Sequence, residues 1–141
     1  MSSKNLKIAE EVKTDLIKQG LQAEIAGSLR RKEYSSHDID IVCGDPKLSP
    51  ETQKIYRFTK IGENVDLYIA NPLHFGAMLL TYTGPKGSNI GLRMKAKSMG
   101  MKLNQYGLYD WKTGRLLASK TEKEILSKLR HPYKEPYLRG K

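Results

Sequence analysis

Several residue types are scarce in this sequence of 141 residues, and each scarcity narrows what the protein can be. Its single cysteine, Cys43, cannot form an internal disulfide or a cysteine-based zinc site, which suits a reducing compartment. No long apolar run occurs, and the first twenty residues alternate charged and apolar positions, so we expect neither a membrane-spanning helix nor a secretory signal. The composition therefore indicates a soluble, non-secreted protein with one domain of ordinary size or two small lobes that share a core.

Acidic residues are scarce in the second part of the chain. Residues 1–85 contain 11 Lys/Arg and 11 Asp/Glu, whereas residues 86–141 contain 14 Lys/Arg and 4 Asp/Glu. The whole net charge of +10 therefore lies in the C-terminal segment. Isolated lysines usually form a solvated helix face. A complete partition of charge instead indicates a neutral part that carries out chemistry and a basic part that binds a phosphate backbone.

The residue pattern predicts an α+β fold. Apolar spacing after Ser3 predicts a helix that ends at Gly20, and alternating apolar residues predict strands at 21–25 and 38–42. Residues 55–70 read as two strands joined around Gly62-Glu63-Asn64. Further along, we expect a short helix after Asn71-Pro72, a basic helix from about Ser88 to Gly100, strands around 103–109 and 115–118, and a helix from Thr121 to about 130.

Two aspartates separated by one isoleucine stand in the second predicted strand. Because side chains alternate along a strand, Asp38 and Asp40 project from one face while Ile39 enters the core. Two close carboxylates repel each other unless a cation neutralises them. If Asp66 on a neighbouring strand faces the same side, three hard oxygen ligands surround one site, and Mg²⁺ prefers such ligands. An isolated D-x-D pair is more often only a polar strand face.

The residues before this strand strengthen the functional interpretation. Gly27-Ser28 follows a predicted strand directly and precedes a possible helical turn that carries Arg30 and Arg31. Backbone N–H groups, a hydroxyl and guanidinium charge at such a place suit a phosphate.

These features resemble a known family. A Gly-Ser pair, two arginines, D-x-D on a strand and a later lone aspartate form the nucleotidyltransferase pattern of the DNA polymerase beta superfamily. Further segments are similar to successive parts of family X DNA polymerases: TYTGPKGSNIGLR, GMKLNQYGLYD, TEKEIL and YKEPYLR. The resemblance covers nearly the whole chain from about residue 20. It implies a catalytic palm at about 1–70 and a nucleotide- and template-binding basic subdomain at 71–141. Because the chain begins almost at the palm, we expect a minimal, viral-type member without the family's lyase and helical DNA-binding domains.

The resemblance also implies a role for each aspartate. Asp38 and Asp40 would bridge two catalytic Mg²⁺ ions, for which Mn²⁺ could substitute. Asp66 would bind the ion at the primer terminus and help to take the 3′-hydroxyl proton. Two ions about 4 Å apart stabilise the attacking and leaving oxygens of an in-line displacement.

The remaining site residues are likewise implied by the resemblance. Gly27, Ser28 and Arg31 would hold the incoming triphosphate, Tyr82, Gly84 and the backbone near Thr81 would line the sugar, and Asn89 would reach the base. Arg93 would touch the template strand, and the lysines Lys86, Lys95, Lys97 and Lys102 would neutralise DNA phosphates. We also expect the Gly84-Pro85 peptide bond to be cis, as family members bend the chain sharply here.

The implied function is templated addition of a dNTP to a primer 3′ end, in primer–template or gapped DNA, by a monomer that fills short gaps in repair wherever the DNA is. Two alternatives stay open. One is a nucleotidyltransferase that works without a template on a nucleic-acid end or a small molecule, and the segment with Asn89 and Arg93 argues against it. The other is an inactive DNA-binding protein that kept the fold, and the three retained aspartates argue against that.

Three further side chains receive ordinary structural interpretations. We expect Trp111 to pack against its hairpin rather than stack on a base, His74 to be structural, and His37 to be a partly exposed loop residue.

Overall fold

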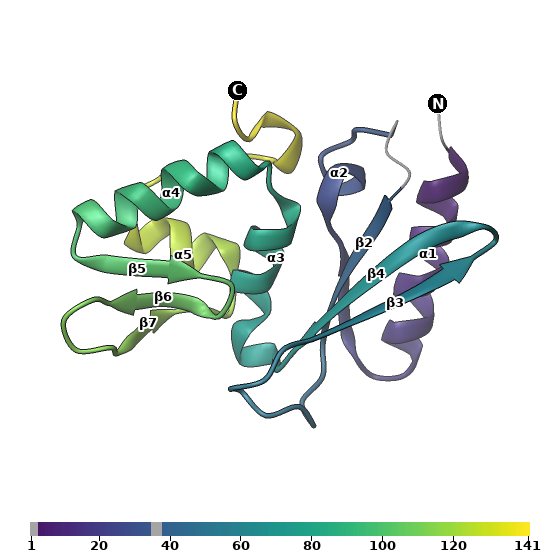
Figure 1. Cartoon of the computed structure of the whole chain (residues 1–141), viewed down its shortest axis with the longest axis horizontal. Coiled ribbons are helices and arrows are strands. Elements are labelled where there is room, and N and C mark those ends of the chain that lie inside the picture. The colour runs from purple at the N-terminus through teal and green to yellow at the C-terminus, as the bar shows by residue number, and fades with distance from the viewer. Residues whose placement is uncertain (1–2, 35–37) are drawn as a thin grey trace.

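A mixed four-stranded sheet forms the first half of the protein, whose computed structural model describes residues 3–34 and 38–141 (Figure 1). The strands are β1 (Gln22–Ile25), β2 (Asp38–Gly44), β3 (Lys54–Lys60) and β4 (Glu63–Ala70). Their order is β1-β2-β4-β3, with β2 and β4 parallel and the other two pairs antiparallel. The α+β class and these predicted strands are confirmed, while His37 lies outside the described residues.

Helix α1 (Ser3–Lys18) covers one face of this sheet (Figure 1). Its apolar residues, including Ile8 and Val12, pack against Ile39, Ile41 and Val65 of the central strands. The helix ends before Gly20, whose φ of +83° lies in the left-handed region that glycine adopts without strain. The apolar side of the D-x-D strand therefore faces α1, as the alternation predicts.

Helix α3 (Phe75–Thr83) joins the two halves of the molecule (Figure 1). It follows the short 3₁₀ turn η1 (Pro72–His74), whose start is capped because the Asn71 side chain accepts a hydrogen bond from the Leu73 N–H. Phe75 and Met78 pack against the first sheet, while Leu80 packs in the C-terminal core. Because α3 contributes to both cores, its residues are buried along almost the whole helix.

The second half places two helices against a three-stranded sheet. The helices are α4 (Lys86–Ser98) and α5 (Glu122–Lys128), and the strands are β5 (Met101–Asn104), β6 (Gly107–Asp110) and β7 (Leu116–Ala118), followed by the 3₁₀ turn η2 (Pro136–Leu138). The strand order is β5-β6-β7, all antiparallel.

Two sequence predictions need correction here. Residues 103–109 are not a single strand, because the chain reverses at Gln105–Tyr106, where the Asn104 side chain accepts hydrogen bonds from the N–H groups of Tyr106 and Gly107. Helix α4 begins at Lys86 rather than near Ser88, directly after Pro85 in its N-cap. The Gly84-Pro85 bond is cis, as predicted.

A buried ion cluster connects the beginning, middle and end of the chain. Glu122, at the start of α5, accepts two hydrogen bonds of 2.8 Å from Arg30 of α2 (Gly27–Arg30) and two of 2.8 and 3.2 Å from Arg139. Arg30 also donates to the hydroxyl of buried Thr83 at 2.9 Å. Next to the cluster, α3 and the start of α5 touch at Gly76, where an added Cβ would lie 2.3 Å from the Thr121 backbone.

Among the helices of the described residues, none is long and apolar enough to cross a bilayer, as expected from the sequence.

We expect Glu122→Ala to destabilise the protein by about 3–5 kcal/mol, because it leaves the buried guanidinium of Arg139 and the partly buried one of Arg30 without their carboxylate. Glu124→Ala, at an exposed position of the same helix, is the matched control and should change stability by no more than about 0.5 kcal/mol. Denaturant unfolding at pH 7 measures both values. Equal effects of the two substitutions would show that the cluster does not hold the fold.

The loss should depend on pH. Burial alone would raise the pKa of Glu122, but hydrogen bonds and charge from Arg30 and Arg139 outweigh it and lower the pKa below the ordinary value. Because the folded-state pKa is lowered, the stabilisation is fully present above the ordinary glutamate pKa of about 4.3 and is lost as the pH falls through the folded value. The unfolding free energies of wild type and Glu122→Ala should therefore converge in acid.

Candidate active site

Strand register places the three predicted carboxylates on one face of the first sheet. Asp40 of β2 and Asp66 of β4 are direct partners in the parallel pairing, and Asp38 is paired with Asn64. Neighbouring strands lie about 4.8 Å apart, and partners in register project to the same side. Asp38, Asp40 and Asp66 therefore lie on the same face of the sheet.

Crowding of negative charge perturbs the central carboxylate. Burial, followed by the charges of Asp66 and Asp38, raises the pKa of Asp40 to about 6. The Tyr68 hydroxyl, 3.5 Å from Asp40 Oδ1, and the positive charge of Arg31 act in the opposite direction but do not cancel the rise. A half-buried carboxylate beside two further carboxylates is suited to binding a hard cation.

Asp66 is held by a residue that the sequence analysis did not identify. Arg57 on β3 is its register partner, and the two form an ion pair with an Nε–Oδ1 distance of 3.1 Å. In the parts of the chain that the structure describes, no group of three acidic, histidine or cysteine side chains already surrounds one point as a formed metal site. The donor set nevertheless fits a divalent cation such as Mg²⁺, because all three side chains offer hard oxygens from one face.

The backbone at Gly27 approaches the same carboxylates. Gly27 has φ of +60°, and a Cβ added to it would lie 2.3 Å from Oδ2 of Asp40. Only glycine satisfies both conditions. The Ala26 N–H donates to the Asp40 carbonyl at 2.8 Å, which fixes the start of α2 beside the aspartates.

A cleft of about 460 Å³ lies between this face and the second half of the molecule. Its lining includes Asp38 and Asp40 together with every residue predicted to bind the nucleotide: Gly27, Ser28, Arg31, Thr81, Tyr82, Gly84 and Asn89. Lys86 and Arg93 of α4 complete it. Asp66 lines an adjoining hollow of about 440 Å³ with Asp38, Arg57 and Asn64, so the carboxylates stand between two recesses.

The end of α3 forms one wall of the cleft, and hydrogen bonds and ring stacking hold it in place. Asn89 donates its amide to the carbonyls of Leu80 and Thr81 at 3.1 and 3.0 Å, and Arg31 donates to the Thr83 carbonyl. The Tyr82 ring stacks on Tyr68, with centroids 3.8 Å apart. Asn89 therefore lines the cleft, while its amide nitrogen supports the backbone at the end of α3.

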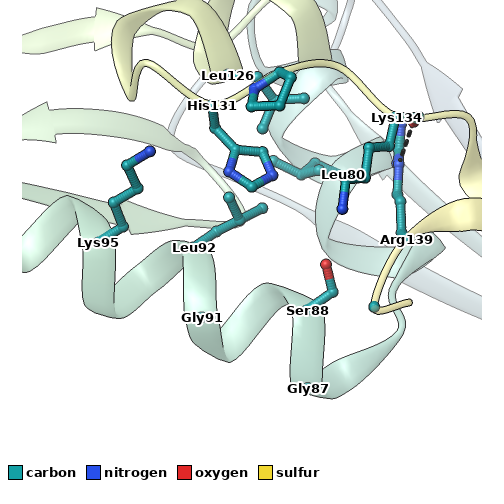
Figure 2. A pocket seen from close by; sticks show the side chains of 12 residues that line it. Leu80, Gly87, Ser88, Gly91, Leu92, Lys95, Leu126, His131, Lys134 and Arg139 are labelled. Atoms are coloured by element: carbon teal, nitrogen blue, oxygen red, sulfur yellow. Dashed lines mark hydrogen bonds between the residues drawn. The ribbon is translucent and has the colours of Figure 1, made fainter.

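The predicted DNA-binding residues lie on α4 and β5. Lys86 and Arg93 line the nucleotide cleft, and Lys97 is exposed on α4. Lys95 borders a separate cavity of about 340 Å³ between α4 and the C-terminal tail, opposite His131 (Figure 2). Burial and the charges of Lys95 and Lys134 lower the pKa of His131. Lys102 lies on β5, next to Trp111.

Known proteins similar to this chain indicate its family. The family model described as DNA polymerase beta thumb matches residues 78–140. The protein named Repair DNA polymerase X from a tick isolate of African swine fever virus (Pretoriuskop, South Africa) is 31% identical in an alignment 136 residues long, and the match covers 80% of this chain and 78% of the viral protein. Its counterpart from a Namibian warthog isolate is 30% identical with the same coverage. The chain belongs to the family X DNA polymerases.

Within this family X polymerase, the sequence analysis missed three contacts of the site. Arg57 is the partner of Asp66, Tyr68 contacts Asp40 and stacks on Tyr82, and Glu122 binds Arg30. The sequence did contain a signal for the Arg57–Asp66 pair. Once the turn of the predicted hairpin 55–70 is placed at Ile61-Gly62, the alternation of side chains puts Arg57 on the same face as Asp66.

The structure also bears on the expectations for His74 and Trp111. His74 is buried and bonded to the Tyr106 carbonyl, as expected, whereas Trp111 is exposed, so hairpin packing was the wrong prediction.

We expect Asp40→Asn to make the metal-free polymerase more stable at neutral pH. The folded-state pKa of Asp40 is raised, so the stability gained from its protonated form is present below the ordinary aspartate pKa of about 3.9 and is lost as the pH rises to about 6. With EDTA present, the melting temperature of the variant should exceed that of wild type above pH 6, and the difference should shrink towards pH 4.

Added Mg²⁺ should reverse this order by raising the melting temperature of wild type more than that of Asp40→Asn. Asp15→Asn, on an exposed part of α1, is the control and should behave as wild type. An Asp40→Asn protein less stable than wild type at pH 7.5 in EDTA would contradict the charge crowding inferred for this face.

Proposed function

We propose that this family X member is a template-directed DNA polymerase that adds a deoxynucleotide to a primer 3′ end and fills short gaps during repair. One observation carries the proposal: Asp38 and Asp40 line a cleft whose other walls are the Gly27–Arg31 turn, the end of α3 and the start of α4. In this division of work, residues 1–70 act as the catalytic palm and residues 71–141 as the nucleotide- and template-binding subdomain. The membership of the chain in a family of DNA polymerases supports both assignments.

The proposed chemistry uses the carboxylates of the cleft, Asp38 and Asp40, and that of the adjoining recess, Asp66. Asp38 and Asp40 would be shared by two divalent ions, while Asp66, in the adjoining recess, would hold the primer side. When bound, two Mg²⁺ ions, or Mn²⁺ in their place, supply acidification of the primer hydroxyl and neutralisation of the charge on the leaving pyrophosphate. Arg57 neutralises Asp66 in the metal-free protein, so its guanidinium must give up the carboxylate when the primer side is occupied.

The rest of the cleft positions the substrate. Gly27 and Ser28 offer a close backbone approach and a hydroxyl to the triphosphate, and Arg31 adds a positive charge. Tyr82, whose ring stacks on Tyr68, would contact the sugar. Arg93, which is exposed on α4, would contact the template strand. Orienting the α-phosphate beside the primer oxygen supplies much of the rate enhancement, because the reacting groups are then already aligned.

We expect Asp66→Asn to abolish primer extension while leaving Mg–dNTP binding within about threefold of wild type, because Asp66 does not line the nucleotide cleft. Extension of a labelled primer with Mg²⁺ should require the template strand and the complementary dNTP. Asp15→Asn serves as the active control.

Two results would overturn this proposal in different ways. Extension of single-stranded primers at the rate seen with template would favour a template-independent nucleotidyltransferase. Near wild-type extension by Asp66→Asn would remove the role given to that residue.

A further inference from the structure

The single tryptophan of the chain is exposed on the C-terminal sheet. Trp111 directly follows β6, and 59% of its surface is accessible. Leu103 and Leu108 of the same hairpin point to the buried core, whereas Lys102 and its register partner Tyr109 point away from it. The β5-β6-β7 sheet therefore has an outer face that carries an aromatic and basic group of side chains, and the nucleotide cleft does not include it.

This outer face is hollowed rather than flat. A recess of about 410 Å³ is lined by Lys102, Asn104, Tyr109, Asp110, Trp111 and Gly114. The Lys102 ammonium lies 5.9 Å from the centre of the Trp111 ring. A ring with one open side and a cation beside it can stack a nucleic-acid base while the cation neutralises the adjacent phosphate.

The charge around the recess favours a polyanion. Residues 101–120 contain four basic residues and one acid, Asp110. The carboxylate of Asp110 accepts the Lys112 N–H at 3.0 Å and so shapes the turn that presents Trp111. Exposed Lys112 and Arg115 extend the positive charge to the end of the hairpin.

The hairpin also connects this face to the palm. At its turn, the Gln53 amide donates to the Gln105 carbonyl at 2.9 Å. The face therefore extends from the contact with the palm outwards to Trp111, and its four-residue strands are about 13 Å long.

We propose that the outer face of the β5-β6-β7 sheet binds the unpaired template strand of the DNA substrate, with bases stacked on Trp111 and Tyr109 and phosphates near Lys102 and Lys112. The assignment to the template strand rests on the proposed polymerase function. It adds a second DNA contact, made through bases without sequence preference, to the contacts in the cleft.

Because Trp111 is the only tryptophan, its fluorescence reports on this face alone. Titration of the whole protein with an oligo(dT) of about 15 nucleotides at low salt should quench the emission in a saturable way, and added salt should weaken the effect. A blunt duplex of equal length should quench less. Absence of quenching by the single strand would overturn the proposal and would indicate that this face does not bind nucleic acid.

Variants test whether the stacking contributes to affinity. Trp111→Ala should weaken binding of a labelled oligo(dT), followed by anisotropy, about tenfold, while Trp111→Phe should retain most of the affinity. Tyr56→Ala is the matched control, because Tyr56 is 53% exposed but lies on the other sheet, on the face opposite the carboxylates. Equal affinity of Trp111→Ala and wild type would contradict the proposal.

Two primer–templates test whether the DNA strand bound at this face is the template. They differ only in the length of the unpaired template overhang, which is one nucleotide in the first and about ten in the second. Wild type should bind the longer overhang more tightly, and Trp111→Ala should lose that preference. If wild type extends both primers but shows no preference, the template assignment is wrong while the polymerase function stands. If Trp111 is quenched but wild type extends neither primer, the proposed function fails and the assignment to template fails with it.

Discussion

One buried carboxylate holds the functional cleft together. Glu122 binds Arg30 from the first half of the chain and Arg139 from its end, and Arg30 continues to Thr83 at the end of α3. The neighbouring Arg31 lines the cleft and donates to the Thr83 backbone, so both walls of the cleft are tied at the same place. A buried ion cluster of this kind adds little stability over a hydrophobic one of equal volume, and we infer that its role is to fix one arrangement of its partners. Its contribution here is the relative position of the two walls.

On the carboxylate face of the sheet, negative side chains lie beside one another. Glu122 is matched by two arginines, whereas Asp40 lies beside Asp38 and Asp66 with only Arg31 and the Tyr68 hydroxyl to offset their repulsion. Burial, together with the charges of Asp66 and Asp38, raises the pKa of Asp40. A chain that keeps such repulsion in its core strands gains from it only when cations and phosphates arrive, as expected of a nucleotidyl-transfer site. Gly27 allows the Gly27–Arg31 turn to lie directly against that charge.

Local periodicity explains what could be predicted from the sequence. The alternation around Asp38–Asp40 and in 55–70 determined which side chains share a face, and a period of two leaves little freedom once one face is buried. Partners that depend on the tertiary fold were not predictable: Arg30 and Glu122 are separated by 92 positions, and the pairing of Arg57 with Asp66 depends on hairpin register. The turn at Gln105–Tyr106 did have a local signal, since Asn104 and Gly107 flank it. Exposure of Trp111 had none, because an aromatic residue at a strand end packs or protrudes according to its neighbours.

The central claim is that the Glu122 cluster sets the nucleotide cleft, and Glu122→Gln tests it most directly, since glutamine keeps the shape but removes the charge. The measurement is the affinity for Mg–dNTP at a temperature where circular dichroism shows the variant fully folded, with Glu124→Gln as the control on the same helix. The account predicts nucleotide binding at least about tenfold weaker in Glu122→Gln and unchanged in Glu124→Gln, because loss of charge-assisted hydrogen bonds worth about 1.5–3 kcal/mol frees the two walls. Wild-type affinity in folded Glu122→Gln would contradict it.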